Sequence, residues 1–294
     1  MTRRPSATLA VVALFTLVTL AGAASCTKKE SPRAAQTAAH RVVSLSPSTT
    51  EAIVAIGAGD ALVGRSRYCD FPPDVLKLPQ VGGYADPNLE AIFALKPDLV
   101  VGARGPAGPQ LAEKLAAHGA GTYFPETESF AQIDSMLLGL GERTGHAAEA
   151  RAVVVRIDAR VAGVTEAVRS LPKLRVLMVF GLTPIVVTGP KSFPNEMLER
   201  AGGANAVTEG MAYPVLGMER VFALDPDVIV NCAMAEAHGS EQIHKDAPGW
   251  KNLRAVKEGK VIALSDESVL RPGPRVGDAL AILAHAIHPE AKIP

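Results

Sequence analysis

The sequence predicts an α/β protein built from two similar lobes with one long helix between them. Residues 89–103, LEAIFALKPDLVVGA, resemble residues 218–233, MERVFALDPDVIVNCA, when Leu89 is aligned with Met218 at an offset of 129 positions (218 − 89). Each copy places apolar residues at helical spacing, reaches a proline that cannot continue the helix, and then enters a β-branched stretch. A helix and a buried strand, found twice at a domain-sized distance, indicate two α/β lobes.

Length and periodicity support this organisation. The chain has 294 residues, of which 48% are hydrophobic, and this is enough for two cores. Between Glu142 and Arg169 there is no proline, and apolar residues recur at helical spacing among many Ala, Glu and Arg residues. We therefore expect one linking helix over residues 142–172, and because a continuous helix is a poor hinge we expect only small lobe motions.

The first lobe is expected over residues 41–140 and the second over residues 174–294, each with a central parallel sheet of the Rossmann type. In the first lobe, a strand, a helix with a Ser/Pro/Thr start and a second strand precede the first repeat copy, and a further helix and strand follow it. The second lobe opens with the apolar strand LRVLMVFG and closes with a helix from Val276 to His288.

The loops that follow the strands are the expected place for a ligand. In open α/β sheets, ligands bind beyond the carboxyl ends of the strands, so two such lobes facing each other would enclose a cleft. The loops concerned are those at Tyr68, Tyr84, Arg104, Gly181, Cys232 and Arg271.

The N-terminal sequence predicts an export signal over residues 1–26. Arg3 and Arg4 precede an apolar run that is shorter than a bilayer span, and small residues lead to Cys26. GAASC resembles a bacterial lipoprotein cleavage box, which would make Cys26 a lipidated N-terminus; cleavage by the general signal peptidase is the alternative. Residues 27–40 are polar and are expected to form a flexible tether on the periplasmic or cell-surface side of the membrane.

Charge and motif content argue against two other classes of protein. The 30 basic and 30 acidic residues cancel, and no basic cluster is interleaved with aromatics, so nucleic acid is not an expected partner. No GxSxG, GxxxxGK[ST] or HExxH motif occurs, so we do not expect an enzyme.

Several segments together resemble the helical-backbone class of ABC-transporter substrate-binding proteins, which deliver cobalamin, haem and ferric siderophores. They are RVVSLSPSTTEAIVAIGAGDALVG, YCDFPPDV, LPQVGGYADPNLEAIFALKPDLVV, TGPKSFPNEMLERAGGANA and RPGPR. Within the class, YCDFPP and VGGYADPNLE look most like the periplasmic cobalamin-binding protein family. The resemblance implies a monomer without a cofactor of its own, which carries cobalamin to a permease dimer with ATPase subunits; haem or a ferric siderophore is the alternative ligand.

The resemblance also implies roles for individual residues. Tyr68, Tyr84 and Arg271 match residues near the ligand, and Arg104 lies in a neighbouring strand-end loop. Aromatic faces suit a flat macrocycle, and arginine can hydrogen-bond an amide rim. The chain departs from the pattern at Ala103, where the family has a tryptophan. Trp250 is the only tryptophan in the chain.

Two exposed glutamates are implied as contacts for the transporter. Glu90 and Glu199 match glutamates, one in each lobe, that such proteins present to arginines of the permease. A carboxylate on each lobe would give two-point docking, and exposed charges act mainly on the rate of encounter.

The cysteines and histidines leave two questions open. Cys232, Glu236, His238, Glu241 and His244 gather near one expected cleft loop and could hold a metal, although their spacing fits no compact zinc motif. A haem-binding variant could use His238, His244 or Tyr68 as an axial ligand. Cys69 and Cys232 could form a disulfide or remain two buried thiols.

Overall fold

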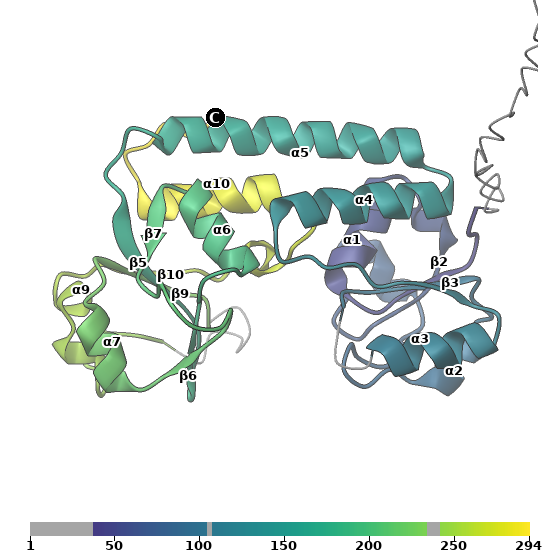
Figure 1. The fold of residues 1–294 in the computed structure, drawn as a ribbon, viewed down its shortest axis with the longest axis horizontal. Coiled ribbons are helices and arrows are strands. Elements are labelled where there is room, and N and C mark those ends of the chain that lie inside the picture. Colours follow the sequence, from purple (N-terminus) through teal and green to yellow (C-terminus); the bar gives the residue numbers. More distant parts are fainter. Residues whose placement is uncertain (1–37, 105–107, 234–241) are drawn as a thin grey trace, which may run out of the picture. The chain divides into compact units, whose positions relative to one another are not determined.

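The chain folds into two α/β lobes, each built around its own β-sheet (Figure 1). The computed structural model describes residues 38–104, 108–233 and 242–294. In the first lobe the strands are β1 (Val42–Ser44), β2 (Leu62–Arg65), β3 (Leu99–Val101) and β4 (Gly121–Tyr123). They pair in the order β2-β1-β3-β4, and every pair is parallel.

The second sheet is mixed, whereas the sequence predicted a parallel one. Its strands are β5 (Leu174–Leu182), β6 (Ile185–Val187), β7 (Gly203–Asn205), β8 (Val215–Leu216), β9 (Val228–Asn231) and β10 (Val261–Ala263). The order is β10-β9-β5-β6-β8, with β7 beside the first part of β5. Strand β6 follows β5 after only Thr183 and Pro184, and this connection is too short for a parallel crossover. Strands β6 and β8 therefore run antiparallel to their neighbours, and the other pairs are parallel.

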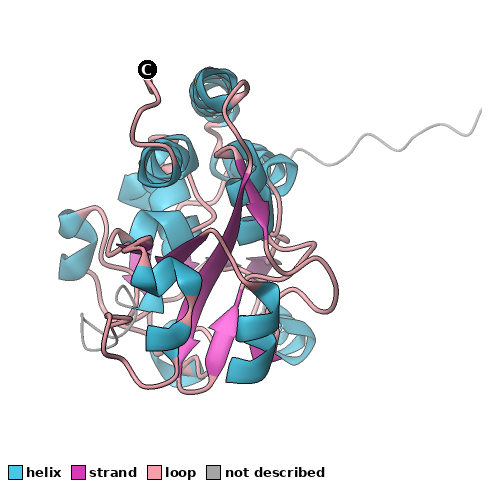
Figure 2. Ribbon diagram, turned by 90° about the vertical axis from the view of Figure 1, so that its left-hand side faces the viewer, coloured by secondary structure: helices cyan, strands magenta, loops and turns pink. Residues whose placement is uncertain are grey.

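Helices cover both faces of each sheet (Figure 2). The longer helices are α1 (Pro47–Ala55), α2 (Leu89–Ala94), α3 (Gly108–Ala117), α4 (Phe130–Thr144), α5 (Ala147–Val168), α6 (Phe193–Arg200), α7 (Met218–Leu224), α9 (Arg254–Lys257) and α10 (Val276–Ile287). Successive residues of β5 show the alternation: Met178 packs in the core on one side of the sheet, and Leu177 and Val179 pack in the core on the other. No helix in the described part of the chain has the length and apolar character needed to cross a membrane.

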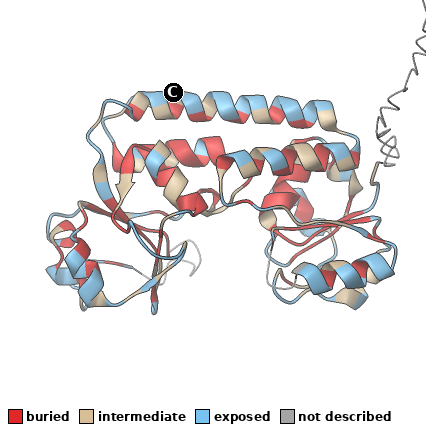
Figure 3. Ribbon diagram, in the orientation of Figure 1, coloured by how far each residue is buried: buried red, intermediate tan, exposed pale blue. Residues whose placement is uncertain are grey.

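The prediction of two lobes joined by one long helix is confirmed, although the helix begins later than expected. Helix α5 starts at Ala147, because Gly145 adopts a left-handed conformation (φ 78°) that ends α4 at Thr144. Residues 142–144, expected in the linking helix, thus belong to α4, and the expected residues 169–172 follow the end of α5 at Val168. Helix α5 packs on α4 and on α10, and its buried residues recur at helical spacing along that face (Figure 3).

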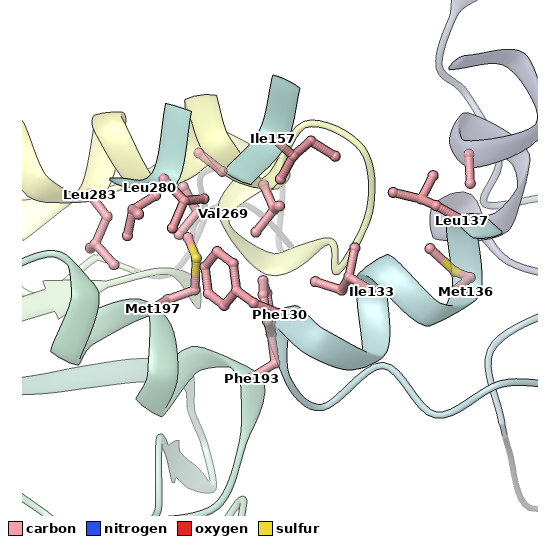
Figure 4. Close-up of a cluster of buried hydrophobic side chains, with 14 of the residues drawn as sticks. Phe130, Ile133, Met136, Leu137, Ile157, Phe193, Met197, Val269, Leu280 and Leu283 are labelled. Atoms are coloured by element: carbon pink, nitrogen blue, oxygen red, sulfur yellow. The ribbon is translucent and has the colours of Figure 1, made fainter. Parts of the chain in front are cut away.

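One hydrophobic core runs through both lobes (Figure 4). Ile133 and Leu137 of α4 lie in the same buried cluster as Met197 of α6 and Leu280 of α10. Ile157 of α5 contributes to this cluster between the two ends. Because one continuous core is shared, the lobes are not independent bodies on a flexible strap.

Asp134 on α4 provides a test of the packing between α4 and α5. Burial and the nearby Asp158 of α5 raise its pKa to about 6, above the ordinary value in the unfolded chain. The folded state therefore binds more protons between about pH 4 and pH 6, and stability falls as pH rises through this window. We expect Asp134→Asn to raise the free energy of unfolding at pH 7 by about 1 kcal/mol, since partial exposure reduces the effect.

The advantage of Asp134→Asn should disappear near pH 4, where the wild-type carboxyl is protonated. Urea unfolding followed by circular dichroism at both pH values measures it. Equal stability of the two proteins at pH 7 would contradict the raised pKa of this half-buried carboxyl.

Candidate ligand-binding site

An open cavity of about 360 Å³ lies at the carboxyl end of strand β5. Its walls come from the β5–β6 hairpin, the first turn of α6, the loop before α10, the segment between β4 and α4 and the segment between β7 and β8. The lining residues are Thr127, Glu128, Phe180, Gly181, Thr183, Pro184, Val186, Phe193, Pro194, Tyr213, Leu270 and Pro272. The sequence identified the loop at Gly181 for this role, and the volume falls in the range of small-molecule sites.

Aromatic and aliphatic side chains form most of the lining. Phe180 and Tyr213 lie with their ring centroids 6.1 Å apart and tilted by 60°. Tyr213 is 41% exposed, and Phe193 contributes a third ring. Such a surface can hold a large, partly flat ligand through contact area, with few hydrogen bonds needed for orientation.

Glu128 is the charged residue among the described residues of the lining. Its Oε2 accepts a hydrogen bond from the Tyr213 hydroxyl (3.0 Å) and another from the backbone N–H of Phe193 (3.2 Å). Burial raises the pKa of Tyr213, and Glu128 adds to the shift, so the phenol is a neutral donor at physiological pH.

The ends of helices α4 and α6 are tied together beneath the cavity. Glu128, just before α4, accepts from Phe193 at the start of α6, and Glu196 of α6 accepts from the backbone N–H of Phe130 at the start of α4 (3.0 Å). Each carboxylate thus satisfies a backbone donor of the other helix and lies at its positive end. The rings of Phe130 and Phe193 pack against each other, with centroids 6.0 Å apart.

Tyr84 and Tyr213 lie at the same offset of 129 positions (213 − 84), each five residues before its copy of the repeat. The Tyr84 hydroxyl donates to the Arg104 carbonyl at 2.8 Å. Burial, then Glu128 and Glu126, raise the pKa of Tyr84. Both tyrosines therefore lie in the field of Glu128. Sequence reasoning missed Tyr213, although the repeat offset could have found it from Tyr84.

Two further predicted ligand residues, Tyr68 and Arg104, lie close to Tyr84. Tyr68 is 54% exposed, and a Cβ at Gly83 would meet its ring at 3.0 Å, so Tyr68 is a close neighbour of the loop that carries Tyr84. Arg104 forms an ion pair with Glu126. The structure thus brings Tyr68, Tyr84 and Arg104 together at one rim of the first lobe.

Arg271 lies in a network of carboxylates. Its guanidinium contacts Asp70 (2.7 Å), Glu51 (3.2 Å) and Glu267. Arg271 lowers the pKa of Asp70, chiefly through the hydrogen bonds between them. Its chain neighbours Leu270 and Pro272 line the cavity, so a ligand contact by Arg271 itself stays a prediction.

Glu51 of α1 joins this network to the start of α10. Its carboxylate is 2% exposed and accepts two hydrogen bonds of 2.7 Å from the Nε and Nη2 atoms of Arg275. Because α1 belongs to the first lobe and α10 to the second, Glu51, Arg271 and Arg275 form an ionic clasp between the lobes, a term used below for these three residues.

The two predicted docking glutamates are exposed on different helices. Glu90 lies in the first turn of α2, and Glu199 lies on α6, where its Oε1 accepts from Asn195 (2.9 Å). The repeat partner of Glu90 is Glu219, which is exposed in the first turn of α7. The repeat therefore relates Glu90 to Glu219, and Glu199 has no counterpart in it.

The alternative metal cluster falls largely outside the described residues, which exclude Glu236, His238 and Glu241. Cys232 is buried, and His244 is exposed, with its Nδ1 accepting from the Asp246 backbone (3.3 Å). Within residues 38–104, 108–233 and 242–294, no group of three His, Cys, Asp or Glu residues could hold a metal ion.

The thiols and the tryptophan lie in the interior. No disulfide joins Cys69 and Cys232; both are buried thiols, and the Cys69 sulfur accepts from the Thr50 hydroxyl at 3.1 Å. Trp250 packs in the core of the second lobe with Leu253 and Val256, and it does not line the cavity.

Comparison with known proteins defines the class. The family model for periplasmic binding proteins matches residues 42–267, and the chain belongs to this family. It is 33% identical over 238 residues to the vitamin B12-binding protein of Photorhabdus laumondii, covering 80% of this chain and 83% of that protein.

Solved structures show the same fold. The periplasmic vitamin B12-binding protein of Vibrio cholerae is similar with a TM-score of 0.73 and 29% identity, over 85% of this chain and 96% of that one. The periplasmic haem-binding protein RhuT from Roseiflexus is similar with a TM-score of 0.76 and 26% identity, over 85% of this chain and 98% of that one. The class is one of substrate-binding proteins, as the sequence predicted.

The clasp generates a prediction about stability. Glu51→Ala should lower the free energy of unfolding by about 1–3 kcal/mol, because it leaves the half-buried Arg275 without its carboxylate, while Arg271 keeps Asp70 and Glu267. Urea unfolding measures the change, with Glu90→Ala as an exposed control that should alter stability by no more than about 0.5 kcal/mol. A Glu51 variant as stable as the control would show that the clasp does not hold the lobes.

Proposed function

We propose that this protein is the substrate-binding component of an ABC importer and captures a corrinoid, cobalamin in particular, in the cavity at the end of β5. The observation that carries the proposal is the aromatic lining of that cavity by Phe180, Phe193 and Tyr213. The vitamin B12-binding relatives, which align with most of the chain, support it. The protein acts by binding and delivery, without catalysing a reaction.

The cavity and the first lobe's rim supply complementary contacts for such a ligand. Phe180 and Tyr213 offer ring faces from the second lobe, and Tyr68 and Tyr84 offer them from the first. A corrin ring presents a flat face for these contacts, and its amide side chains can reach backbone and carboxylate acceptors around the edge.

Haem is the second candidate, because Tyr68 has an exposed phenol that could ligate iron and because haem-binding proteins share the fold. A ferric siderophore would use the same open cavity. If His238 or His244, the predicted alternative ligands, binds the iron, the visible spectrum of the haem-loaded protein would show histidine ligation. This spectrum would distinguish haem from cobalamin.

Binding measurements test the ligand. Calorimetric titration with cyanocobalamin should give submicromolar binding, and Tyr84→Ala and Tyr213→Ala should each weaken it about tenfold through the lost ring contact. Phe222→Ala removes an exposed ring of α7 that does not line the cavity, and it should leave the affinity unchanged.

Parallel titrations with hemin and a siderophore panel decide between the candidates. Tight hemin binding and a Soret band that Tyr68→Ala or His238→Ala removes would replace cobalamin by haem. Tight zinc binding, with no binding of any of these ligands, would favour the Cys232–His244 cluster.

For transporter docking, we propose that Glu90 and Glu219 contact the permease dimer, which works with ATPase subunits. A homodimeric permease offers two equivalent surfaces, and the repeat provides two equivalent helices, α2 and α7, with a glutamate in each first turn. Glu199, the residue implied by the resemblance, is the alternative for the second lobe.

Charge reversal tests the docking residues. Glu90→Lys with Glu219→Lys should reduce vesicle uptake several-fold and leave ligand affinity unchanged, because like charges would meet across the interface. Glu149→Lys, on the exposed side of α5, controls for the change in net charge. If Glu199→Lys lowers uptake and Glu219→Lys does not, the second contact is on α6.

The protein reaches the periplasmic or cell-surface side of the membrane through the export signal of residues 1–26, and we propose that a lipid on Cys26 holds it there as a monomer. A diacylglyceryl mass on Cys26 in the mature protein would establish the anchor, whereas an unmodified N-terminus in that region would remove it.

A further inference from the structure

We infer that Glu128 makes the cavity select ligands with amide hydrogen-bond donors at the rim over ligands with carboxylates there. The inference rests on the proposed function and concerns the choice between cobalamin and haem. The aromatic rings of the lining do not make this choice, because they suit corrin and porphyrin faces equally. It assigns a specificity role to a residue that neither the repeat nor the predicted strand-end positions identified.

The position of the Glu128 carboxylate is fixed by the fold. Oε2 is held by the Tyr213 hydroxyl at 3.0 Å and by the Phe193 N–H at 3.2 Å. Among the described residues, none donates a hydrogen bond to Oε1, and the residue is exposed in the cavity wall. A ligand donor can therefore approach a carboxylate that is already oriented, without first ordering it.

The nearby arginines are occupied by other carboxylates. Arg104 pairs with Glu126, and Arg271 with Glu51, Asp70 and Glu267. Lys191, which precedes α6, forms no ion pair with Glu128 in the described structure and is not part of the lining. Among the described residues, the lining thus carries a negative charge without a cation to receive a ligand carboxylate.

The chemistry of the two ligand classes then differs at their edges. The side chains around a corrin ring end in neutral amides, whose N–H groups can donate to Glu128. The two propionates of haem are carboxylates that can only accept, and they would be repelled by Glu128. The same apolar lining therefore distinguishes the ligands by the charge at their rim.

A set of matched ligands tests the inference. Wild-type protein, Glu128→Gln and Glu149→Gln would be titrated with cyanocobalamin and with its three monocarboxylic acids, in each of which one propionamide has become a propionate. We expect wild type to bind at least one acid about tenfold more weakly than cyanocobalamin, as like charges at a partly exposed site repel. Glu128→Gln should reduce this ratio to less than about threefold, and Glu149→Gln should retain it.

Glutamine keeps an oxygen that can accept from Tyr213 and Phe193, so the variant should fold normally, and its thermal unfolding checks this. The inference is overturned if wild type binds all three acids as tightly as cyanocobalamin, or if Glu128→Gln keeps the wild-type ratio. Wild type that binds none of the corrinoids would overturn the proposed ligand instead. In that case hemin and its dimethyl ester test the inference. The ester must bind wild type more tightly than hemin does, and Glu128→Gln must remove this difference in affinity. Tighter binding of hemin than of the ester overturns the inference.

Discussion

The relative position of the two lobes depends on a carboxylate buried between them. Glu51 is 2% exposed and is shared by Arg275 and Arg271. A buried carboxylate without partners would be strongly unfavourable, so the arginines and the glutamate must stay together. This requirement brings the loop before α10 against the start of α1. A Cβ added to Gly273 of this loop would lie 3.5 Å from the Cα of Ser48. Leu270 and Pro272, on the same loop, are thereby brought to the cavity wall.

The cavity uses a second connection between distant segments. The crossed contacts of Glu128 and Glu196 with the starts of α6 and α4 satisfy backbone donors that would otherwise face the interior. They also carry Glu128 into the cavity and hold Tyr213 by its hydroxyl. The side chains that orient a ligand are thus set by helix ends and not by mobile loop tips, and this favours a site formed before the ligand arrives.

The fold could be predicted from the sequence because its main signals are local or repeated. The repeat located a helix and a strand in each lobe, and the run after Glu142 located the long helix, apart from its start at Ala147. The antiparallel β6 was missed because the short turn at Thr183 and Pro184 was not recognised as a hairpin. The direction of one strand does not alter the apolar pattern that revealed it.

The site could be predicted only in part, because its contacts join residues far apart in the chain. Arg271 and Asp70 are 201 positions apart, and Arg271 and Glu51 are 220 apart, so no spacing rule relates them. Arg271 has these carboxylate partners, and its expected contact with a ligand stays a prediction. The offset of the repeat could have predicted Tyr213 from Tyr84. No sequence pattern indicates Glu128, because its role depends on hydrogen bonds from the distant Phe193 and Tyr213.

The shared core of α4, α5, α6 and α10 has a consequence for how the chain can be divided. Either lobe, if cut away, would expose the apolar surface that Ile157, Met197 and Leu280 now cover together. The molecule should therefore fold and unfold in a single cooperative step, although its architecture shows two sheets. Neither sheet with its own helices is therefore a complete folding unit.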